Sequence, residues 1–262
     1  MTATGSSTVL RLPLLQRAGL RHGFTTRAAG DFAWDRLRTE SGRAALVALG
    51  EEVGFDPLKV VTCEQVHGTA VAVAHLCERC GPGNRVPHTD GLITEEPWAL
   101  LTVHADCYPV VLFVPAAPMV AVVHAGWRGT VGGIVPRAVA RLVRESGAGP
   151  SSILAGIGPG ICGGCYQVGA EVAAAAQDAG LTDHVRPDPE AQRWRFDIAS
   201  ALRQQLREAG IPAGSIETIE ACTFEDAGLF SFRRDHGPER GAAVVVLDGG
   251  RVLAGGAQAH LD

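Results

Sequence analysis

The chain of 262 residues is 46% hydrophobic and carries a formal net charge of −5. A chain of this length and composition can bury a large core as one large domain or two small ones, and we favour one domain. The acidic balance and the absence of Lys/Arg runs argue against a nucleic-acid-binding surface and favour small substrates, anionic ones among them.

The start of the chain and its apolar segments argue against export and membrane insertion. Residues 1–8 are polar and lack the basic region and apolar stretch of a secretory signal, so the cytoplasm is the expected compartment. The longest apolar run, residues 110–123, is too short to span a bilayer and contains two prolines, which predict a turn between strands. Seven cysteines without an export signal predict free thiols or metal ligands rather than a disulfide framework.

Hydrophobic periodicity and turn residues predict a series of elements along the chain. In chain order they are a strand at residues 9–14, a helix at 42–53, strands at 59–62, 70–74, 91–94, 99–104, 110–113 and 119–124, a helix at 132–145, a strand at 153–157, helices at 169–179 and 198–209, and strands at 216–220, 242–247 and 251–255. Residues 30–41, 77–89 and 183–192 are the most loop-like. Strands outnumber helices and several are consecutive, so the pattern predicts an α+β fold with mixed or antiparallel sheets rather than a regular βαβ alternation.

Three potential ligands of a soft metal lie in short motifs. His67 lies in Gln65-Val66-His67-Gly68, Cys107 in His104-Ala105-Asp106-Cys107, and His124 in His124-Ala125-Gly126-Trp127-Arg128-Gly129. Two imidazoles and one thiolate are typical of a catalytic zinc site, because one position of the tetrahedral metal stays open for water or substrate. Each residue alone is more often structural, but the three together predict a metal-dependent enzyme.

The predicted strands place two of these ligands at strand ends. Cys107 follows the strand at 99–104, and His124 ends the strand at 119–124. If both strands are hairpin-like neighbours of the strand at 110–113, their ends converge on one rim of a sheet.

The polar groups around these ligands each have two interpretations. Asp106 is either a carboxylate that supports the metal or acts as a general base, or a turn residue with a local backbone bond. The Gly-rich turn at 126–130 either binds an anion together with Arg128 or only permits close packing. Arg233 and Arg234 form either a phosphate or carboxylate clamp or part of a salt-bridged surface strand.

Two further motifs give weaker signals. Residues 156–161 are rich in glycine but lack the Gly-Lys-Ser/Thr ending of a P-loop. The pairs Cys77/Cys80 and Cys162/Cys165 suggest a four-thiolate zinc site, yet their separation far exceeds the usual loop of ~15–20 residues, which argues against one shared site.

The order of several motifs resembles that of the YfiH-like, laccase-domain family, from about His22 to the C-terminus. Besides the three ligand motifs, the matching segments are Ile157-Gly158-Pro159, Tyr166-Gln167-Val168-Gly169, Cys222-Thr223 and Phe230-Ser231-Phe232-Arg233-Arg234-Asp235. The family is described as zinc-dependent purine nucleoside phosphorylases with adenosine deaminase activity, earlier labelled multicopper polyphenol oxidases. The resemblance implies an α+β, mixed-sheet α/β sandwich with flanking helices. It also implies one YfiH-like laccase-type domain over residues 1–262, with residues 1–20 as N-terminal strand and lead-in.

By the same resemblance, His67, Cys107 and His124 hold zinc, with copper as an alternative. The implied substrates are phosphate and a purine nucleoside such as adenosine, inosine or methylthioadenosine, with no nucleic-acid or membrane partner. In deamination zinc would activate water for attack at the purine C6 position, whereas phosphorolysis needs phosphate held close by arginines or helix-end N–H groups.

The resemblance also suggests roles for individual side chains. Arg27, Arg128 and Arg233 are the candidates for phosphate binding, and Asp106 is the candidate for proton transfer. His104 stands where the family usually has Thr, and it is a candidate fourth ligand, acid/base group or spectator. The segment after Arg27 departs from the family pattern, so no other residue of that loop carries over.

Three other enzyme classes remain alternatives. A cysteine hydrolase would use Cys107 as nucleophile with His124 or His67 as base. A copper-dependent polyphenol oxidase is disfavoured by the few grouped histidines and the two methionines. A hydrolase that edits cell-wall precursors would use the same metal to cleave an amide.

Overall fold

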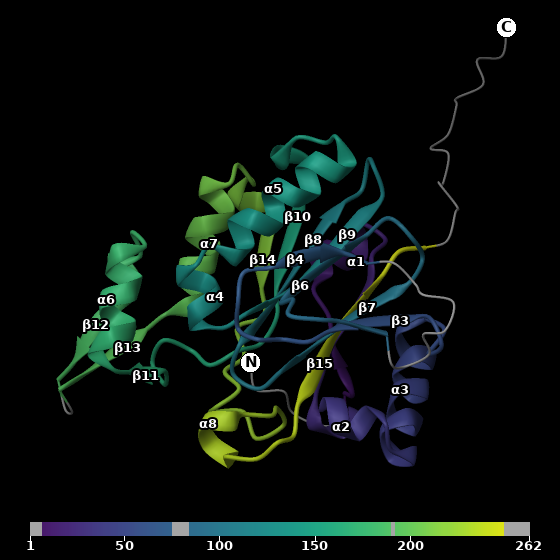
Figure 1. Ribbon diagram of the computed structural model, residues 1–262, viewed down its shortest axis with the longest axis horizontal. Helices are drawn as coiled ribbons and strands as arrows, with labels where there is room; N and C mark the ends of the chain where they lie inside the picture. The colour runs from purple at the N-terminus through teal and green to yellow at the C-terminus, as the bar shows by residue number, and fades with distance from the viewer. Residues whose placement is uncertain (1–6, 75–83, 190–191, 249–262) are drawn as a thin grey trace, which may run out of the picture.

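The computed structural model describes residues 7–74, 84–189 and 192–248, which form two large sheets lying face to face and a small third sheet at one end (Figure 1). The first sheet is ordered β1 (Val9–Leu10), β2 (Arg21–Thr25), β15 (Gly241–Val246), β7 (Ala99–His104), β3 (Val60–Cys63), β5 (Asn84–Val86). The second is ordered β14 (Ile216–Thr218), β10 (Leu154–Ile157), β8 (Tyr108–Val114), β9 (Met119–Ala125), β6 (Gly91–Thr94), β4 (Val71–Val73). The third is ordered β11 (Gln167–Val168), β13 (Arg193–Phe196), β12 (Val185–Asp188).

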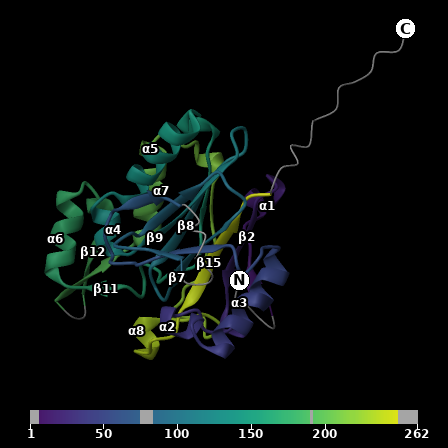
Figure 2. The same ribbon diagram turned by 45° about the vertical axis from the view of Figure 1, so that its right-hand side comes forward.

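Helices cover the outer faces of the two large sheets. The longer helices are α3 (Glu40–Val53), α5 (Ile134–Ser146), α6 (Ala170–Asp178) and α7 (Ile198–Glu208), and the short ones are α1 (Pro13–Arg17), α2 (Trp34–Leu37), α4 (Trp127–Val131) and α8 (Phe232–Asp235). Single 3₁₀ turns lie at η1 (Arg27–Ala29), η2 (Pro150–Ser152), η3 (Thr182–His184) and η4 (Ala213–Ser215). Helix α3 packs on the first sheet, α5 and α7 on the second, and α6 on the small sheet, which lies on the side opposite α3 (Figure 2).

The central strands are apolar along their whole length because both of their faces are covered. Successive side chains of a strand point to opposite faces, so a strand buried on both sides shows no apolar/polar alternation. In β8, Val111 and Phe113 lie in the core between the two large sheets, whereas Val110, Leu112 and Val114 pack in the core beneath the helices. The same division holds in β15, whose alternate residues face the other sheet and helix α3.

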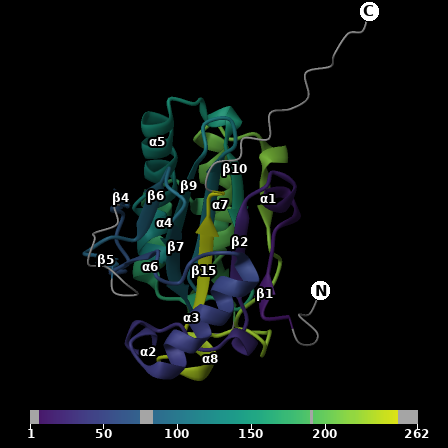
Figure 3. The ribbon, with the colours of Figure 1, turned by 90° about the vertical axis from the view of Figure 1, so that its right-hand side faces the viewer.

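Most of the predicted elements are present, and the fold is the mixed-sheet sandwich expected. Strands β6 and β7 have the predicted bounds, and the predicted helices correspond to α3, α5, α6 and α7 with ends that differ by a few residues. Parallel and antiparallel pairs both occur, since β3 pairs in parallel with β5 and β7 while β15 pairs antiparallel with β2 and β7. Figure 3 shows β15 beside β2, which joins segments from opposite ends of the chain.

Several expectations for the fold were wrong. The predicted strand at 9–14 ends at Leu10, because Pro13 starts helix α1 at a position where its missing N–H costs nothing. The strand at 99–104 is not a neighbour of β8, since it lies in the first sheet between β15 and β3. The predicted loops at 30–41 and 183–192 contain helix α2 and strand β12, and the described part of the predicted loop at 77–89 contains strand β5. The predicted strand at 251–255 lies outside the described residues.

Within the described ranges, no helix has both the length and the apolar content needed to cross a membrane.

Candidate metal centre and its pocket

Cys107 lies where the chain leaves the first sheet and enters the second. Strand β7 ends at His104, and β8 begins at Tyr108, which is paired with Ala125 at the end of β9. The crossing therefore brings Cys107 beside His124, although β7 and β9 belong to different sheets. The two ligands thus meet as expected, by a different route from the one predicted.

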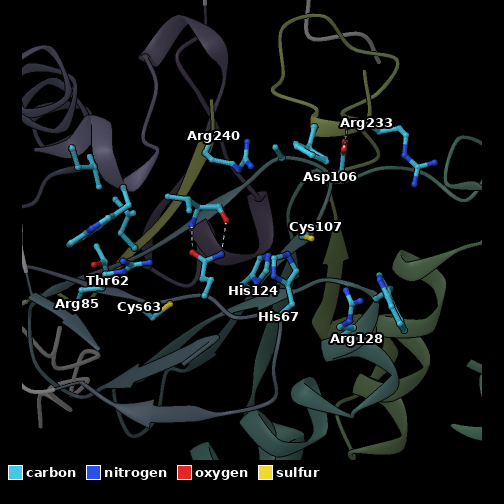
Figure 4. A pocket seen from close by; sticks show the side chains of 18 of the residues that line it. Thr62, Cys63, His67, Arg85, Asp106, Cys107, His124, Arg128, Arg233 and Arg240 are labelled. Atoms are coloured by element: carbon cyan, nitrogen blue, oxygen red, sulfur yellow. Dashed lines mark hydrogen bonds between the residues drawn. The ribbon is translucent and has the colours of Figure 1, made fainter. Parts of the chain in front are cut away.

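His67 completes the group from the turn between β3 and β4. One ligand atom each from His67, Cys107 and His124 lies within 4.8 Å of the other two. The two imidazole rings are perpendicular, with centroids 4.9 Å apart. In Figure 4 both rings and the thiol point toward one another.

A buried carboxylate that no sequence motif predicted orients two of the candidate ligands. Asp90 is fully buried, and its Oδ1 accepts hydrogen bonds from His124 Nδ1 and from the backbone N–H of His67, each at 2.9 Å. Its Oδ2 accepts the backbone N–H of Gly68 at 2.7 Å. An ionised carboxylate only accepts, so His124 donates from Nδ1, and Nε2 is the ring nitrogen that could bind a metal. The one feature of the sequence that could have indicated Asp90 is its position as a charged residue directly before the apolar strand β6.

The backbone around the cluster is shaped for close approach. His67 and Asp106 have left-handed φ values of 60° and 86°, which non-glycine residues adopt rarely and mostly where the surrounding structure enforces them. A Cβ atom on Gly126 would lie 2.9 Å from Cys107 Sγ and 3.1 Å from His67 Cδ2. Glycine at this position therefore leaves the space in which the three ligands meet.

The charges of the cluster suit metal binding. Burial opposes ionisation of the Cys107 thiol, but the His124 and His67 imidazoles outweigh it and lower the pKa of Cys107 to about 6. Burial likewise opposes protonation of His124, whereas the Cys107 thiolate and Asp90 raise the pKa of His124 to about 9. A metal bound here would take the place of that proton and would leave the thiolate and a neutral imidazole as its ligands.

A cavity of about 490 Å³ opens over the cluster. Besides the three ligands it is lined by Trp34, Leu37, Thr62, Cys63, Gln65, Arg85, Leu101, Val103, Ala105, Asp106, Trp127, Arg128, Tyr166, Phe232, Arg233 and Arg240. Arg85 lies over the ring of Trp34, Arg128 over Trp127, Arg233 over Tyr166 and Arg240 over Phe232, with guanidinium carbons 4.4–5.5 Å from the ring centroids. The pocket thus combines a group of potential metal ligands, positive charge and aromatic surface (Figure 4).

Two of the predicted phosphate-binding arginines line this pocket and the third does not. Arg128 and Arg233 face the cavity, whereas Arg27 forms an ion pair with Asp235 and donates from Nε to the carbonyl of Leu229. Arg85 and Arg240 also line the pocket, and neither lies in a motif that singled it out in the sequence. Both come close to the site through tertiary packing alone.

The remaining candidates also have defined places. Asp106 lines the pocket, where its Oδ1 accepts from Thr223 Oγ1 and its Oδ2 from the backbone N–H of Arg233, both at 2.7 Å. His104 is buried beside the pocket, and its ring nitrogens contact Thr102 Oγ1 at 2.8 Å and the carbonyl of Cys107 at 3.2 Å. Arg234 lies in helix α8 rather than in a strand, and its guanidinium binds carbonyl groups of residues 223–229.

Comparison with known sequences identifies the family. Residues 37–248 match the family described as multi-copper polyphenol oxidoreductase laccase. The chain belongs to this family. It is 39% identical over 249 residues to a Deinococcus radiodurans protein named purine nucleoside phosphorylase, a match that covers 90% of this chain and 91% of that protein. It is 36% identical over 208 residues to a protein of an unknown prokaryotic organism named adenosine deaminase RL5, covering 76% of this chain and 78% of that protein.

Solved structures agree with this assignment. YlmD from Geobacillus stearothermophilus superimposes with a TM-score of 0.79 at 30% identity, covering 94% of this chain and 98% of that one. The Bacillus licheniformis protein YfiH gives a TM-score of 0.84 at 26% identity, covering 94% and 99%. The resemblance to the YfiH-like family and the mixed-sheet α/β fold are both confirmed.

Proposed function

We propose that this protein is a zinc-dependent purine nucleoside phosphorylase that also deaminates adenosine. The observation that carries the proposal is the joint placement of a two-imidazole, one-thiolate cluster with four arginines and four aromatic rings around one cavity. A volume of about 490 Å³ lies within the range of small-molecule sites. The names of the relatives, purine nucleoside phosphorylase and adenosine deaminase, support the same pair of reactions.

The donor set fits zinc. His67, Cys107 and His124 offer two nitrogens and one sulfur, a set that leaves a metal one open position. The Asp90 carboxylate behind His124 and the space above Gly126 are further features expected of a built metal site. Bound zinc would act as a Lewis acid that activates water for attack at the purine C6 position. Copper is the alternative cofactor, since imidazole and thiolate also bind copper.

The arginines of the pocket would hold the phosphate, because a phosphate ion needs several charge-assisted donors. Among the described residues, Arg85 Nε is buried without a hydrogen-bond partner, as expected of a donor that meets an anion in the complex. Arg233 uses one donor on the carbonyl of Gln167, which fixes its guanidinium against Tyr166. Arg128 and Arg240 add positive charge, and within residues 7–74, 84–189 and 192–248 neither forms an ion pair with a carboxylate, so the pocket stays available to an anion.

The aromatic side chains would hold the base of the nucleoside, since a purine stacks favourably on aromatic surfaces. Asp106 is the group proposed to move a proton to or from the purine during either reaction. Its two hydrogen bonds, from Thr223 and the Arg233 backbone, fix the direction of the carboxylate in the pocket wall. His104 contacts the carbonyl of Cys107 instead of lining the cavity, so we assign it a positioning role.

The test incubates zinc-loaded protein with adenosine, inosine and methylthioadenosine, with and without phosphate, and separates the products by chromatography. We expect a ribose 1-phosphate product only when phosphate is present, and inosine from adenosine without it. Cleavage of the nucleosides at an equal rate without phosphate would refute the phosphorylase assignment.

A cysteine hydrolase is the second candidate, because the lowered pKa of Cys107 and the adjacent His124 would also activate a nucleophile. The cytoplasm remains the proposed compartment. It agrees with Cys63, Cys107, Cys162, Cys165 and Cys222 all being free thiols.

A further inference from the structure

A second group of metal-binding side chains lies outside the pocket. Cys162 and Cys165 meet Cys222 and Glu225, and one ligand atom from each lies within 4.8 Å of the others. The sequence pattern paired Cys162 and Cys165 with Cys77 and Cys80, which lie outside the described residues. The partners that the structure provides come instead from a segment sixty residues further along the chain.

Two turns of the same length build this group. Both pairs, Cys162 with Cys165 and Cys222 with Glu225, have two residues between them. The turns follow β10 and β14, which are parallel neighbours, and a parallel bridge between Gly160 and Cys222 continues this pairing up to the cluster. The matched turns therefore bring four donor side chains to one point.

The first turn is closed by its own backbone. The N–H of Cys165 donates to the carbonyl of Cys162 at 2.9 Å, and the N–H of Tyr166 donates to the same carbonyl at 2.9 Å. The N–H of Cys162 donates to Cys222 Sγ at 3.3 Å, which links the two turns directly. Cys165 Sγ lies 3.1 Å from Glu225 Oε1, with the thiol as donor.

We propose that Cys162, Cys165, Cys222 and Glu225 bind a second zinc ion, separate from the metal of the pocket. Three thiolates and one carboxylate form a complete tetrahedral set with no open position, which is typical of a structural zinc site. On binding, the thiols lose their protons to the solvent, and the metal replaces the proton shared between Cys165 and Glu225.

This second zinc would hold two segments that shape the pocket wall. Tyr166, which lines the pocket, directly follows Cys165, and Thr223, which directly follows Cys222, donates to Asp106. The N–H of Ile161, next to Cys162, donates to the carbonyl of Asp106 at 2.9 Å. The site is therefore a positioning element for Asp106 and Tyr166, and its metal does not contact the substrate.

The experiment uses full-length protein carrying His67→Ala and His124→Ala, in which the pocket cannot hold its metal. Purified under reducing conditions and loaded with zinc, this protein should retain about one equivalent of metal. Loaded with cobalt instead, it should show an intense thiolate-to-cobalt charge-transfer band from three thiolates. Zinc should also raise its melting temperature, because a ligand that binds the native state stabilises it.

Adding Cys165→Ser and Cys222→Ser should abolish the retained metal, the cobalt band and the zinc-dependent shift of the melting temperature. Glu225→Gln, which changes an exposed side chain and should leave the fold intact, should weaken zinc binding by at least about 10-fold. Cys63→Ser is the matched control, because that buried thiol belongs to neither cluster, and it should change none of these readouts.

Three outcomes would overturn the proposal. They are a double-histidine variant that retains no zinc, retained zinc that survives loss of both cysteines, and a disulfide among the three cysteines in reduced protein. Since no readout depends on activity and the pocket ligands are already removed, failure here is distinguishable from failure of the proposed phosphorylase function.

Discussion

The candidate metal site of the pocket depends on a few residues whose backbone conformation, hydrogen bonds or lack of a side chain bring the ligands together. His67 adopts a left-handed backbone conformation whose N–H contacts Asp90, and Asp90 in turn holds His124. Gly126 has no side chain at the point where one would enter the cluster. The candidate ligands therefore meet because the backbone of His67 and the neighbouring residues Asp90 and Gly126 have specific geometry.

Gly126→Ala tests this requirement. The added methyl would lie closer to Cys107 Sγ than side chains normally approach, so the thiol must move away and zinc affinity should fall at least about 10-fold. Gly214→Ala is the matched control, because a Cβ there meets nothing within 4 Å. Isothermal titration of zinc into both variants measures the effect. Equal affinities in the two variants would contradict the proposed role of Gly126.

Cys107→Asp separates the metal site from the nucleophile. A carboxylate can bind zinc at ~2.0–2.2 Å but cannot form the thioester of a cysteine hydrolase. We expect Cys107→Asp to keep measurable zinc in the pocket and some nucleoside activity, and Cys107→Ala to lose most of both. Metal content and product formation are measured on the same samples. A fully zinc-loaded Cys107→Asp protein without turnover, together with a covalent intermediate in the wild type, would favour the hydrolase.

At the level of elements, the sequence predicted what depends on local periodicity. The helix at 132–145 was predictable because Ile134, Ala138 and Leu142 repeat at four-residue spacing, and all three are buried in α5. Strand β2 was missed because Arg21, His22 and Gly23 do not form an apolar pattern, although Gly23 is needed where Val9 packs against the strand. Such close packing is a tertiary property that no local pattern records.

The candidate site likewise contains some residues that could be predicted from the sequence and others that could not. The three pocket ligands could be predicted because they lie in short motifs with distinctive chemistry. Asp90, Arg85 and Arg240 could not, since each reaches the site through contacts with segments distant in sequence.

His22 of strand β2 forms a hydrogen bond with Leu12 at the start of helix α1. Because burial lowers its pKa, the pH dependence of stability tests its role. The N–H of Leu12 donates to His22 Nε2, and the ring contacts the Leu20 carbonyl through Nδ1. Burial lowers the pKa of His22 below 6.5, so the unfolded chain binds a proton more readily than the native protein. The neutral imidazole of His22 therefore contributes to the free energy of unfolding. This contribution is complete above pH 6.5, the ordinary pKa of histidine, and is lost as the pH falls through the lower pKa of the folded protein.

We therefore expect the free energy of unfolding of metal-free protein to fall below pH 6.5 with a shallower slope in His22→Gln. Urea unfolding followed by circular dichroism between pH 5 and 7.5 gives both slopes, and the slope rather than the absolute stability is compared. Identical slopes would show that His22 does not titrate on unfolding.

In the whole molecule, the three candidate metal ligands lie outside the apolar cores, although Leu37, Cys63 and Leu101 of the pocket wall belong to these cores. The pocket collects side chains from Trp34 to Arg240, whereas the apolar clusters lie between and outside the two large sheets. No pocket ligand belongs to these clusters, so loss of the pocket metal should leave the fold in place. An open catalytic site also contributes less to folding than a closed structural site does.

The most direct test of the central claim is to measure zinc content and phosphate-dependent ribose 1-phosphate formation on the same samples of wild type, His67→Ala and His124→Ala. Both variants should stay folded by circular dichroism, contain about one zinc fewer than the wild type, and lose phosphorolysis in parallel with that metal. Full metal retention in both variants, or undiminished phosphorolysis after its loss, would contradict the assignment of these residues as the metal centre of a nucleoside phosphorylase.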